Sequence, residues 1–187
     1  MGWILQDKLK SMGFAALGEH VLISEKASIY GADKIRLGNN VRIDDFALLS
    51  AGAGGIEIGD YVHIAIQSSL IGAGKITMAS FSGLSSRVSV YSSNEDYSGA
   101  TLTNPTVPKE YSGTIHADVM IGRHVIIGSG SIVLPGVTIE EGCAVAALSM
   151  VKKDCAAFGI YSGVPASRVK ERKRDLLELE KKLRSAQ

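Results

Sequence analysis

Residues 121–156 read IGRHVI-IGSGSI-VLPGVT-IEEGCA-VAALSM-VKKDCA, which is six consecutive units of six residues. Each unit opens with Ile or Val, and its fifth residue is small or β-branched. A period of six matches neither the 3.6-residue turn of a helix nor the two-residue alternation of a strand. It is typical of a hexapeptide β-helix, in which each unit supplies one short strand and one corner of a triangular coil. The sequence therefore predicts a prism whose interior is filled by the branched first residues.

The same period extends toward the N-terminus in a less regular form. It is clear at Leu37, Ile43 and Leu49, and it resumes at Ile58 and at Met78 after short slips. We expect each slip to form a bulge at a corner of the prism. The predicted β-helix spans residues 21–160.

The period of six is absent from residues 91–113, which are polar and contain two Pro and three Tyr. A long loop expelled from a regular repeat is usually either functional or disordered. The Pro and Tyr residues favour an ordered excursion. We therefore expect residues 91–113 to project from the prism as a functional loop.

The open ends of a solenoid need covers. Residues 3–17 predict a short amphipathic helix that caps the prism within residues 1–20, because they carry apolar residues at Ile4, Leu5, Leu9 and Met12. After the last repeat, residues 161–187 predict an exit loop followed by a helix over 169–185. We expect the apolar stripe of that helix to dock on the prism; it consists of Val169, Leu176, Leu179 and Leu183.

Composition limits the function. The chain has 187 residues and a formal net charge of +1, so it has no overall basic surface for nucleic acid. No segment is apolar and long enough to span a membrane, and the N-terminus does not read as a signal peptide, which together favour a cytoplasmic protein. The two cysteines, Cys143 and Cys155, both fall at fifth places of the repeat, so we expect small core residues and no metal site.

Two segments at the end of the repeats carry a resemblance. Together with the six clean hexapeptides, residues 151–154 (VKKD) in the last of them and residues 163–166 (GVPA) after it resemble the hexapeptide-repeat acyltransferases. That resemblance implies an all-β solenoid, a left-handed parallel β-helix, which assembles as a homotrimer and uses acetyl-CoA or another acyl-CoA. Left-handedness is implied by the resemblance alone, since general chirality rules favour right-handed crossovers.

Segments in and before the loop narrow the resemblance to one subset of these acyltransferases. Residues 84–92 (LSSRVSVYS), 96–99 (DYSG) and 103–108 (TNPTVP) are similar to the acyltransferases that act on sugars for cell-surface polysaccharides such as O-antigen. Several of these act on nucleotide-linked amino sugars. The resemblance implies transfer of an acyl group from the thioester to a sugar amine, and a sugar O-acetyltransferase of the same fold is the alternative.

The catalytic candidates are His63, Glu95 and Asp96. Many relatives carry a catalytic His in the extruded loop, but the corresponding place here, around Asn94, has none. An amine attacks a thioester without strong base assistance, whereas a hydroxyl needs a base, so the missing His favours N-acylation. Glu95 and Asp96 are candidates to hold the amine or accept its proton. His63 lies in the column that faces the acceptor pocket in relatives, and it is the base of the O-acetyltransferase alternative.

The resemblance also implies binding residues. The substrate-binding candidates in and before the loop are Arg87, Asn94, Tyr97 and Asn104. The CoA-binding candidates near the C-terminal coils are Ser129, Ala147, Lys152, Lys153 and Arg168. Ser129 and Ala147 are eighteen residues apart, which is one coil. The lysines correspond to a pair near the adenine, and Arg168 is placed to bind a phosphate.

Two remote alternatives remain open. Some trimeric β-helix enzymes bind zinc through three His, but His63, His116 and His124 do not reproduce that spacing. A non-catalytic scaffold would bind no CoA. His116, where the loop rejoins the prism, is a further candidate base.

Overall fold

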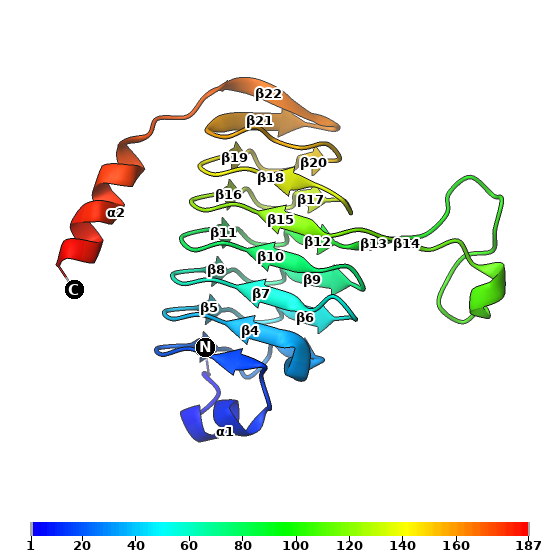
Figure 1. The fold of residues 1–187 in the computed structure, drawn as a ribbon, viewed down its shortest axis with the longest axis horizontal. Helices are drawn as coiled ribbons and strands as arrows, with labels where there is room; N and C mark the ends of the chain where they lie inside the picture. Colours follow the sequence, from blue (N-terminus) through cyan, green and yellow to red (C-terminus); the bar gives the residue numbers. More distant parts are fainter. Residues whose placement is uncertain (1, 187) are drawn as a thin grey trace.

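The computed structural model, which describes residues 2–186, is a β-solenoid with three flat faces (Figure 1). All coil-to-coil pairing along the three faces is parallel, apart from the final strand. Face 1 consists of β1 (Ala16–Leu17), β4 (Ile35–Leu37), β7 (Ile56–Ile58), β10 (Ile76–Met78), β15 (Val119–Ile121) and β18 (Thr138–Ile139). Face 2 consists of β2 (Leu22–Ile23), β5 (Arg42–Ile43), β8 (His63–Ile64), β11 (Gly83–Leu84), β16 (Ile126–Ile127), β19 (Ala144–Val145), β21 (Gly159–Gly163) and β22 (Ala166–Glu171). Face 3 consists of β3 (Ser28–Tyr30), β6 (Leu48–Ala51), β9 (Ser69–Gly72), β12 (Ser89–Tyr91), β17 (Ile132–Val133) and β20 (Met150–Val151).

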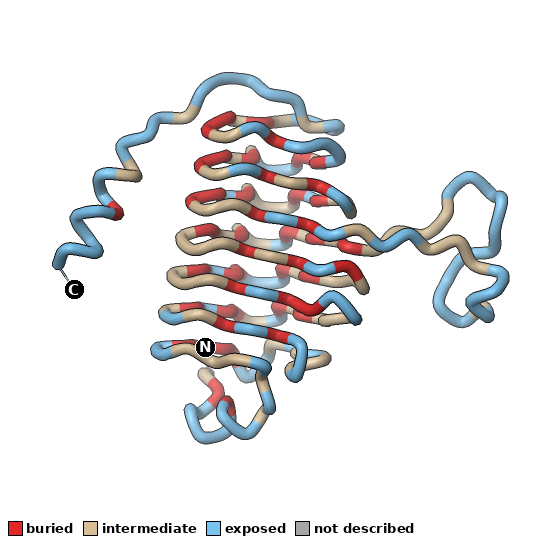
Figure 2. Tube along the Cα trace, viewed as in Figure 1, coloured by how far each residue is buried: buried red, intermediate tan, exposed pale blue. Residues whose placement is uncertain are grey.

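The hexapeptide period sets the core. On face 2, Ile43 pairs in register with Ile64, and Leu84 pairs with Ile127, so the branched first residues of successive coils stack in one column. These four side chains are at most 1% exposed. Buried and exposed residues alternate along every coil (Figure 2). The prediction of a prism filled by the repeated branched residues is confirmed.

One corner of the prism, between faces 3 and 1, absorbs all the extra residues. The early coils carry short insertions there, including the 3₁₀ turn η1 (Ala32–Lys34). At the next coils Gly54 donates to the carbonyl of Ala73 (2.8 Å), and Ala73 donates to Ser93 Oγ (2.7 Å), so the insertions stack on one another. The long loop leaves from this same corner (Figure 1). It is an enlarged version of the earlier slips.

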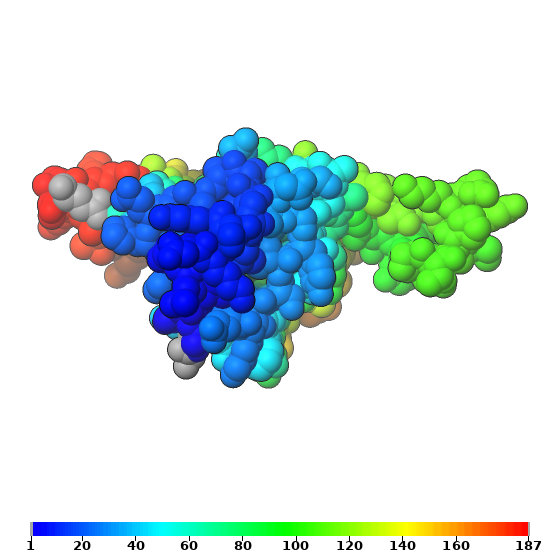
Figure 3. Space-filling model, turned by 90° about the horizontal axis from the view of Figure 1, so that it is seen from below, coloured from blue at the N-terminus to red at the C-terminus, as the bar shows by residue number. Residues whose placement is uncertain are grey.

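The loop begins and ends as a ribbon. Strand β13 (Ser93–Asn94) pairs antiparallel with β14 (Ile115–His116), and beyond them lies a lobe that includes the 3₁₀ turn η2 (Lys109–Tyr111). The excursion therefore reaches to His116, past the predicted end at 113. Ribbon and lobe project far from the prism, on the side opposite the C-terminal helix (Figures 1 and 3).

The two ends of the chain differ in how well they match the prediction. Helix α1 (Gln6–Ser11) covers the first coil and buries Leu9 completely, as the capping prediction required. At the other end, Ala166–Glu171 continues as strand β22, antiparallel to β21, so helix α2 (Asp175–Ser185) starts six residues later than predicted. No helix within residues 2–186 is long and apolar enough to cross a membrane.

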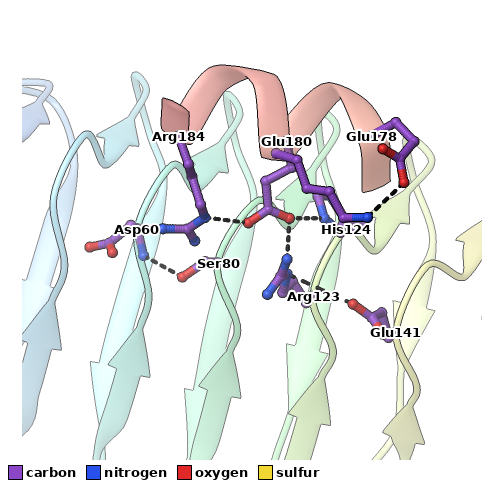
Figure 4. Close-up of polar contacts among 9 residues, drawn as sticks. Asp60, Ser80, Arg123, His124, Glu141, Glu178, Glu180 and Arg184 are labelled. Atoms are coloured by element: carbon purple, nitrogen blue, oxygen red, sulfur yellow. Dashed lines mark hydrogen bonds and ion pairs between the residues drawn. The ribbon is translucent and has the colours of Figure 1, made fainter. Parts of the chain in front are cut away.

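Helix α2 contacts the prism through a charge and not through the predicted apolar stripe. Leu179 is 63% exposed and Leu183 is 41% exposed, whereas Glu180 is only 5% exposed. Glu180 accepts hydrogen bonds from His124 Nε2 (2.6 Å), from Arg123 and from Arg184 (Figure 4). The prediction that the leucine stripe docks on its own prism is therefore wrong, because an ion-pair network turns a different side of the helix inward.

The prism surface under α2 is aromatic. Tyr61 stacks on Phe81 with ring centroids 4.8 Å apart, and Phe81 stacks on His124 at 5.2 Å. The guanidinium of Arg184 lies 5.4 Å from the Phe81 ring centroid, a favourable cation–π arrangement. His124 is 9% exposed and belongs to this support.

Replacing Glu180 by glutamine is expected to release α2. An isolated helix of eleven residues is marginal in water, so loss of the charged anchor should expose its backbone amides. We expect hydrogen exchange of residues 175–185 to accelerate at least about tenfold, while the coils keep their protection. The matched control is Glu178→Gln, which removes an exposed ion pair with Lys181 on the same helix. Equal exchange rates of residues 175–185 in both variants would contradict the role of Glu180 as the anchor of α2.

The contact of Glu180 with the prism also predicts that the docking of α2 depends on pH. Burial alone would raise the pKa of Glu180, but hydrogen bonds from Arg184, His124 and Arg123 lower it to about 2 from its ordinary 4.5. A carboxyl whose pKa is lowered on docking stabilises the docked state above its ordinary pKa, and the contribution is lost as the pH falls toward the lowered value. The protection factors of α2, which are corrected for the intrinsic pH dependence of amide exchange, should thus be constant above about pH 4.5 and should fall between pH 4.5 and 2.

Candidate active site

The root of the ribbon is fixed to the prism by one serine. Ser93 Oγ accepts the backbone N–H of Ala73 (2.7 Å) and lies 2.8 Å from His116 Nδ1 on the facing strand. The backbone of Ala117 also donates to the Ser92 carbonyl (3.0 Å). These bonds define the direction in which the ribbon leaves the corner, and they position the residues that follow Ser93.

Asp96 organises the turn at which the ribbon opens into the lobe. Its carboxylate accepts the backbone N–H groups of Ser98 (2.8 Å) and Thr101 (3.1 Å) and the Thr101 hydroxyl (3.0 Å). Hydrogen bonds from Ser98 and then from Thr101 lower the pKa of Asp96 to about 2. Asp96 is therefore ionised throughout the neutral range and is a poor proton acceptor, since a general base works best with a pKa near the working pH.

Glu95 lies between two grooves. One, the inner groove, has a volume of about 410 Å³ and runs from the ribbon onto face 3. The other, the outer groove, has a volume of about 430 Å³ and lies under the lobe. Glu95 and Thr114 line both grooves, and the Thr114 hydroxyl donates to Glu95 Oε2 at 3.3 Å. Glu95 is thus the carboxylate that lines both grooves.

The two grooves differ in character. The inner groove takes apolar side chains from the later coils, and its further lining residues are Tyr91, Ser93, Asn94, Tyr97, Ile132, Leu134 and Met150. The outer groove is formed by the lobe and by the end of the ribbon, and its further lining residues are Asn104, Pro105, Val107, Lys109, Ser112 and His116.

Three of the four predicted substrate-binding residues line these grooves. Asn94 and Tyr97 line the inner groove, and Tyr97 is 86% exposed. Asn104 lines the outer groove, where its side-chain oxygen accepts the backbone N–H of Thr106 (3.0 Å). Arg87 lies elsewhere, in the turn between β11 and β12, with a left-handed backbone (φ 60°).

His63 is on a different part of the molecule from Glu95 and Asp96. It stands on face 2, half exposed, with its Nε2 2.9 Å from Asp44 Oδ2. Arg42 Nε donates to the other carboxylate oxygen of Asp44 (2.7 Å). Burial would raise the pKa of Asp44, but the hydrogen bonds from Arg42 and His63 lower it. Within one chain the structure does not bring His63 into the grooves beside the loop carboxylates.

The predicted CoA residues lie along the C-terminal coils. The carbonyl of Ser129 accepts from Leu148 N (2.9 Å), which places Ser129 and Ala147 one above the other at the corner between faces 2 and 3. In the coil before, the Ser86 carbonyl accepts from Gly130 N (3.0 Å), so Ser86 continues the same column. Lys152 and Lys153 are exposed at the last coil. Arg168, on β22, forms an ion pair with Glu171.

The cysteines and the remaining histidines give no metal centre within residues 2–186. No group of three or more His, Cys, Asp or Glu side chains in that range is arranged to hold a metal ion. Cys143 and Cys155 are free and buried, and burial raises the pKa of both thiols, that of Cys155 to about 12. Both are therefore unreactive core residues.

Four polar residues of these surfaces were not predicted as site residues from the sequence: Asp44, Ser86, Thr114 and Lys109. Asp44 was not recognised as the partner of His63, since the two are nineteen residues apart and meet only because consecutive coils stack. Thr114 and Lys109 were not singled out within the loop. A polar residue facing Glu95 across the ribbon is detectable only once the pairing of β13 with β14 is known.

Comparison with known proteins places the fold and the loop in one family. Residues 114–153 match the model of the bacterial transferase hexapeptide (six repeats). A dTDP-4-amino-4,6-dideoxy-D-glucose acyltransferase from Escherichia coli is 57% identical over 180 residues, which is 96% of this chain and 94% of that protein. A maltose O-acetyltransferase from Clostridium difficile is 18% identical over 91% of this chain and 80% of that one, with a TM-score of 0.61, and shares the fold alone.

The structural comparison extends through the loop and both ends. AntD, an N-acyltransferase from Bacillus cereus, superposes with a TM-score of 0.95 and 44% identity over 100% of this chain and 99% of that one. That AntD structure holds dTDP-4-amino-4,6-dideoxyglucose and coenzyme A. AntD structures include variants substituted at an aspartate and at a serine ten positions before it.

The chain therefore belongs to the hexapeptide-repeat acyltransferase family, whose fold is the left-handed parallel β-helix. Within that family it is a close homologue of the acyl-CoA-dependent N-acyltransferases of dTDP-linked amino sugars. The expected enzyme class and the preference for an amine acceptor are thus confirmed.

Proposed function

We propose that this protein transfers an acyl group from acyl-CoA to the 4-amino group of dTDP-4-amino-4,6-dideoxyglucose, in the cytoplasm, for a cell-surface polysaccharide. The observation that carries the proposal is the 57% identity to the Escherichia coli acyltransferase of that sugar over 96% of the chain. The AntD complex supports the same pair of ligands. The acyl group, acetyl or longer, is left open, since another AntD structure holds 3-hydroxybutyryl-CoA.

Glu95 is the proposed partner of the reacting amine. The amine nitrogen attacks the thioester carbonyl carbon, a C–N bond forms, and the C–S bond breaks. The amine loses one proton in this step, and the departing thiolate of CoA gains one. A carboxylate that faces both grooves is placed to orient the amine and to carry that proton.

Asp96 and Ser86 are proposed to act with Glu95. They have the order and the spacing of the serine and aspartate that are substituted in AntD, a chain that this one matches from end to end. Asp96 holds the turn that presents Glu95. Ser86 stands at the end of the column formed by Ala147 and Ser129, where its hydroxyl is a candidate donor to the thioester oxygen.

Acyl-CoA is proposed to lie along that column. Small side chains at Ser129 and Ala147 leave room for the pantetheine arm, whose polar groups can reach exposed backbone. Lys152, Lys153 and Arg168 are the proposed partners of the phosphates at the other end. We propose no metal as a cofactor.

We propose that the working enzyme is a homotrimer. The ribbon and lobe expose Tyr97, Leu102 and Ile115 by 86%, 59% and 62%, and they project away from their own prism (Figure 3). Ser86 precedes β12 and the loop follows it, so the two lie at opposite ends of face 3, on the order of 15 Å apart along the strand. A neighbouring copy would cover the lobe and bring a loop and a Ser86 column together.

His63 is proposed to serve the acceptor side of such a shared site. The hydrogen bond to Asp44 fixes one ring nitrogen and orients the imidazole, which is the arrangement that a catalytic or binding His needs. The same arrangement is the observation that favours sugar O-acetylation as the second candidate, with His63 as base.

The test of function is the release of CoA thiol from acetyl-CoA and from longer acyl-CoA thioesters. dTDP-4-amino-4,6-dideoxyglucose should support release, whereas the dTDP sugar with a hydroxyl at the same carbon should not. Release with the hydroxyl sugar alone would establish O-acylation and make His63 the base. Absence of release with every acceptor would contradict the proposal.

A further inference from the structure

The outer groove under the lobe presents hydrogen-bond donors from three separate residues. Asn104, Lys109 and His116 all line it, and they come from the lobe, from η2 and from β14. Its apolar lining comes from Pro105 and Val107. The inner groove, by contrast, includes the apolar side chains of Ile132, Leu134 and Met150 in its lining. The two grooves thus suit ligand groups of different chemistry.

Local contacts leave a hydrogen-bond donor available on two of these residues. The side-chain oxygen of Asn104 accepts both the backbone N–H and the hydroxyl of Thr106, so its NH₂ group is left to donate. Ser93 Oγ already accepts from Ala73 N, and its own hydroxyl proton is available for His116 Nδ1, 2.8 Å away. A neutral imidazole that accepts at Nδ1 carries its proton on Nε2. In that tautomer His116 offers an N–H from Nε2.

Lys109 supplies a charge without a balancing partner. Among the described residues its ammonium takes part in no ion pair, although the neighbouring Ser112 donates to its backbone carbonyl. Glu95, the only acidic residue lining this groove in the described chain, sits at its border with the inner groove and receives the Thr114 hydroxyl. The groove therefore combines these donors with one carboxylate, and Glu95 faces Thr114 on the ribbon between His116 and the lobe.

A ligand that fits this combination of donors and a carboxylate carries an anionic group next to an amine. We infer that the outer groove binds the diphosphate of the nucleotide sugar, with Lys109, His116 and Asn104 as its donors, and that this anchors the sugar with its amine toward Glu95. The inference rests on the proposed function, and it assigns the site within it. A lysine ammonium and neutral N–H donors are common partners of phosphate oxygens.

The test measures binding by calorimetry with the intact protein, with thymidine 5′-diphosphate, thymidine and CoA as separate probes. Lys109→Met removes the charge and keeps the side-chain length. We expect this substitution to weaken the binding of thymidine 5′-diphosphate about 10- to 100-fold and to leave the affinities for thymidine and CoA unchanged. The matched control is Lys34→Met, at an exposed lysine in η1 far from the lobe. His116→Gln, which retains an N–H donor, should bind the diphosphate more tightly than His116→Ala.

Two outcomes would overturn the inference. Unchanged diphosphate binding by Lys109→Met would remove the groove from the nucleotide site. If Lys109→Met weakened the binding of CoA and not that of thymidine 5′-diphosphate, the groove would be assigned to the diphosphate of CoA. Failure of the proposed function is distinguishable, since the wild type would then release no thiol with any dTDP amino sugar. A failure of this inference alone leaves the wild type active and gives Lys109→Met the wild-type KM for the sugar.

Discussion

Glu95→Gln is expected to lower kcat about 100-fold or more, with a much smaller change in KM for acyl-CoA. Loss of a positioned proton acceptor typically costs 10²- to 10⁴-fold, and glutamine keeps the shape and the hydrogen bond from Thr114 while losing the charge. The measurement is steady-state thiol release with both substrates varied. The matched control is Glu110→Gln, an exposed acid in η2 that lines neither groove.

The result that would exclude this role is a Glu95→Gln enzyme with wild-type kcat. A rise in KM for the nucleotide sugar with unchanged kcat would mean that Glu95 binds the ground state and the transition state equally. In that case the amine would need no carboxylate in the chemical step, and the leaving thiolate would be its sole proton acceptor.

Asp96→Ala is expected to cost about 10- to 100-fold in kcat/KM for the nucleotide sugar, because three donors to one carboxylate shape the turn that follows Glu95. Asp96→Asn, which keeps one carbonyl acceptor, should lose less. The matched control is Asp33→Ala, an exposed aspartate in η1. Rates of Asp96→Ala equal to those of the control would show that the turn does not depend on this carboxylate.

The pKa of Asp96 adds a second readout. A carboxyl with a pKa lowered to about 2 stabilises the lobe above its ordinary pKa of 3.8, and this contribution is lost only as the pH falls toward 2. Between pH 5 and 9 Asp96 therefore keeps its charge. Asp96→Asn should reduce the rate by the same factor across that range, and a new limb in the pH profile would contradict the structural role.

The parts of the fold that depend on the six-residue period were predictable from the sequence. Ile43, Ile64 and Leu84 recur at inward positions and stack coil on coil, so the period determines both burial and register. The position of the loop was predictable for the same reason, since an interrupted repeat marks an excursion. The corner of the prism from which the loop leaves was not predictable, because the sequence does not show that the short insertions and the loop share one corner.

The C-terminal helix shows where pattern reading fails. An apolar stripe normally predicts the buried side of a helix, but here Leu179 and Leu183 are exposed and Glu180 is buried. A single acid that meets Arg123 and His124 of a distant coil outweighs the stripe, and nothing in local spacing reveals that meeting. The leucines are free for contacts outside their own chain.

The candidate site was predictable in its residues and not in their roles. Glu95 and Asp96 are adjacent in sequence and alike in chemistry, yet the lobe donors saturate Asp96 while Glu95 faces both grooves. That difference arises from the pairing of β13 with β14, which places Thr114 opposite Glu95. In the same way, it is the fold of the lobe that places Lys109 in the lining of the outer groove.

The most direct test of the account is the identity of the bond that the enzyme makes. The purified protein, acetyl-CoA and dTDP-4-amino-4,6-dideoxyglucose should give a nucleotide sugar that is heavier by one acetyl group. NMR should place that group on the nitrogen at carbon 4, as an amide that resists hydroxylamine. An acetyl group on a sugar oxygen, removed by hydroxylamine, would contradict N-acylation and the role assigned to Glu95.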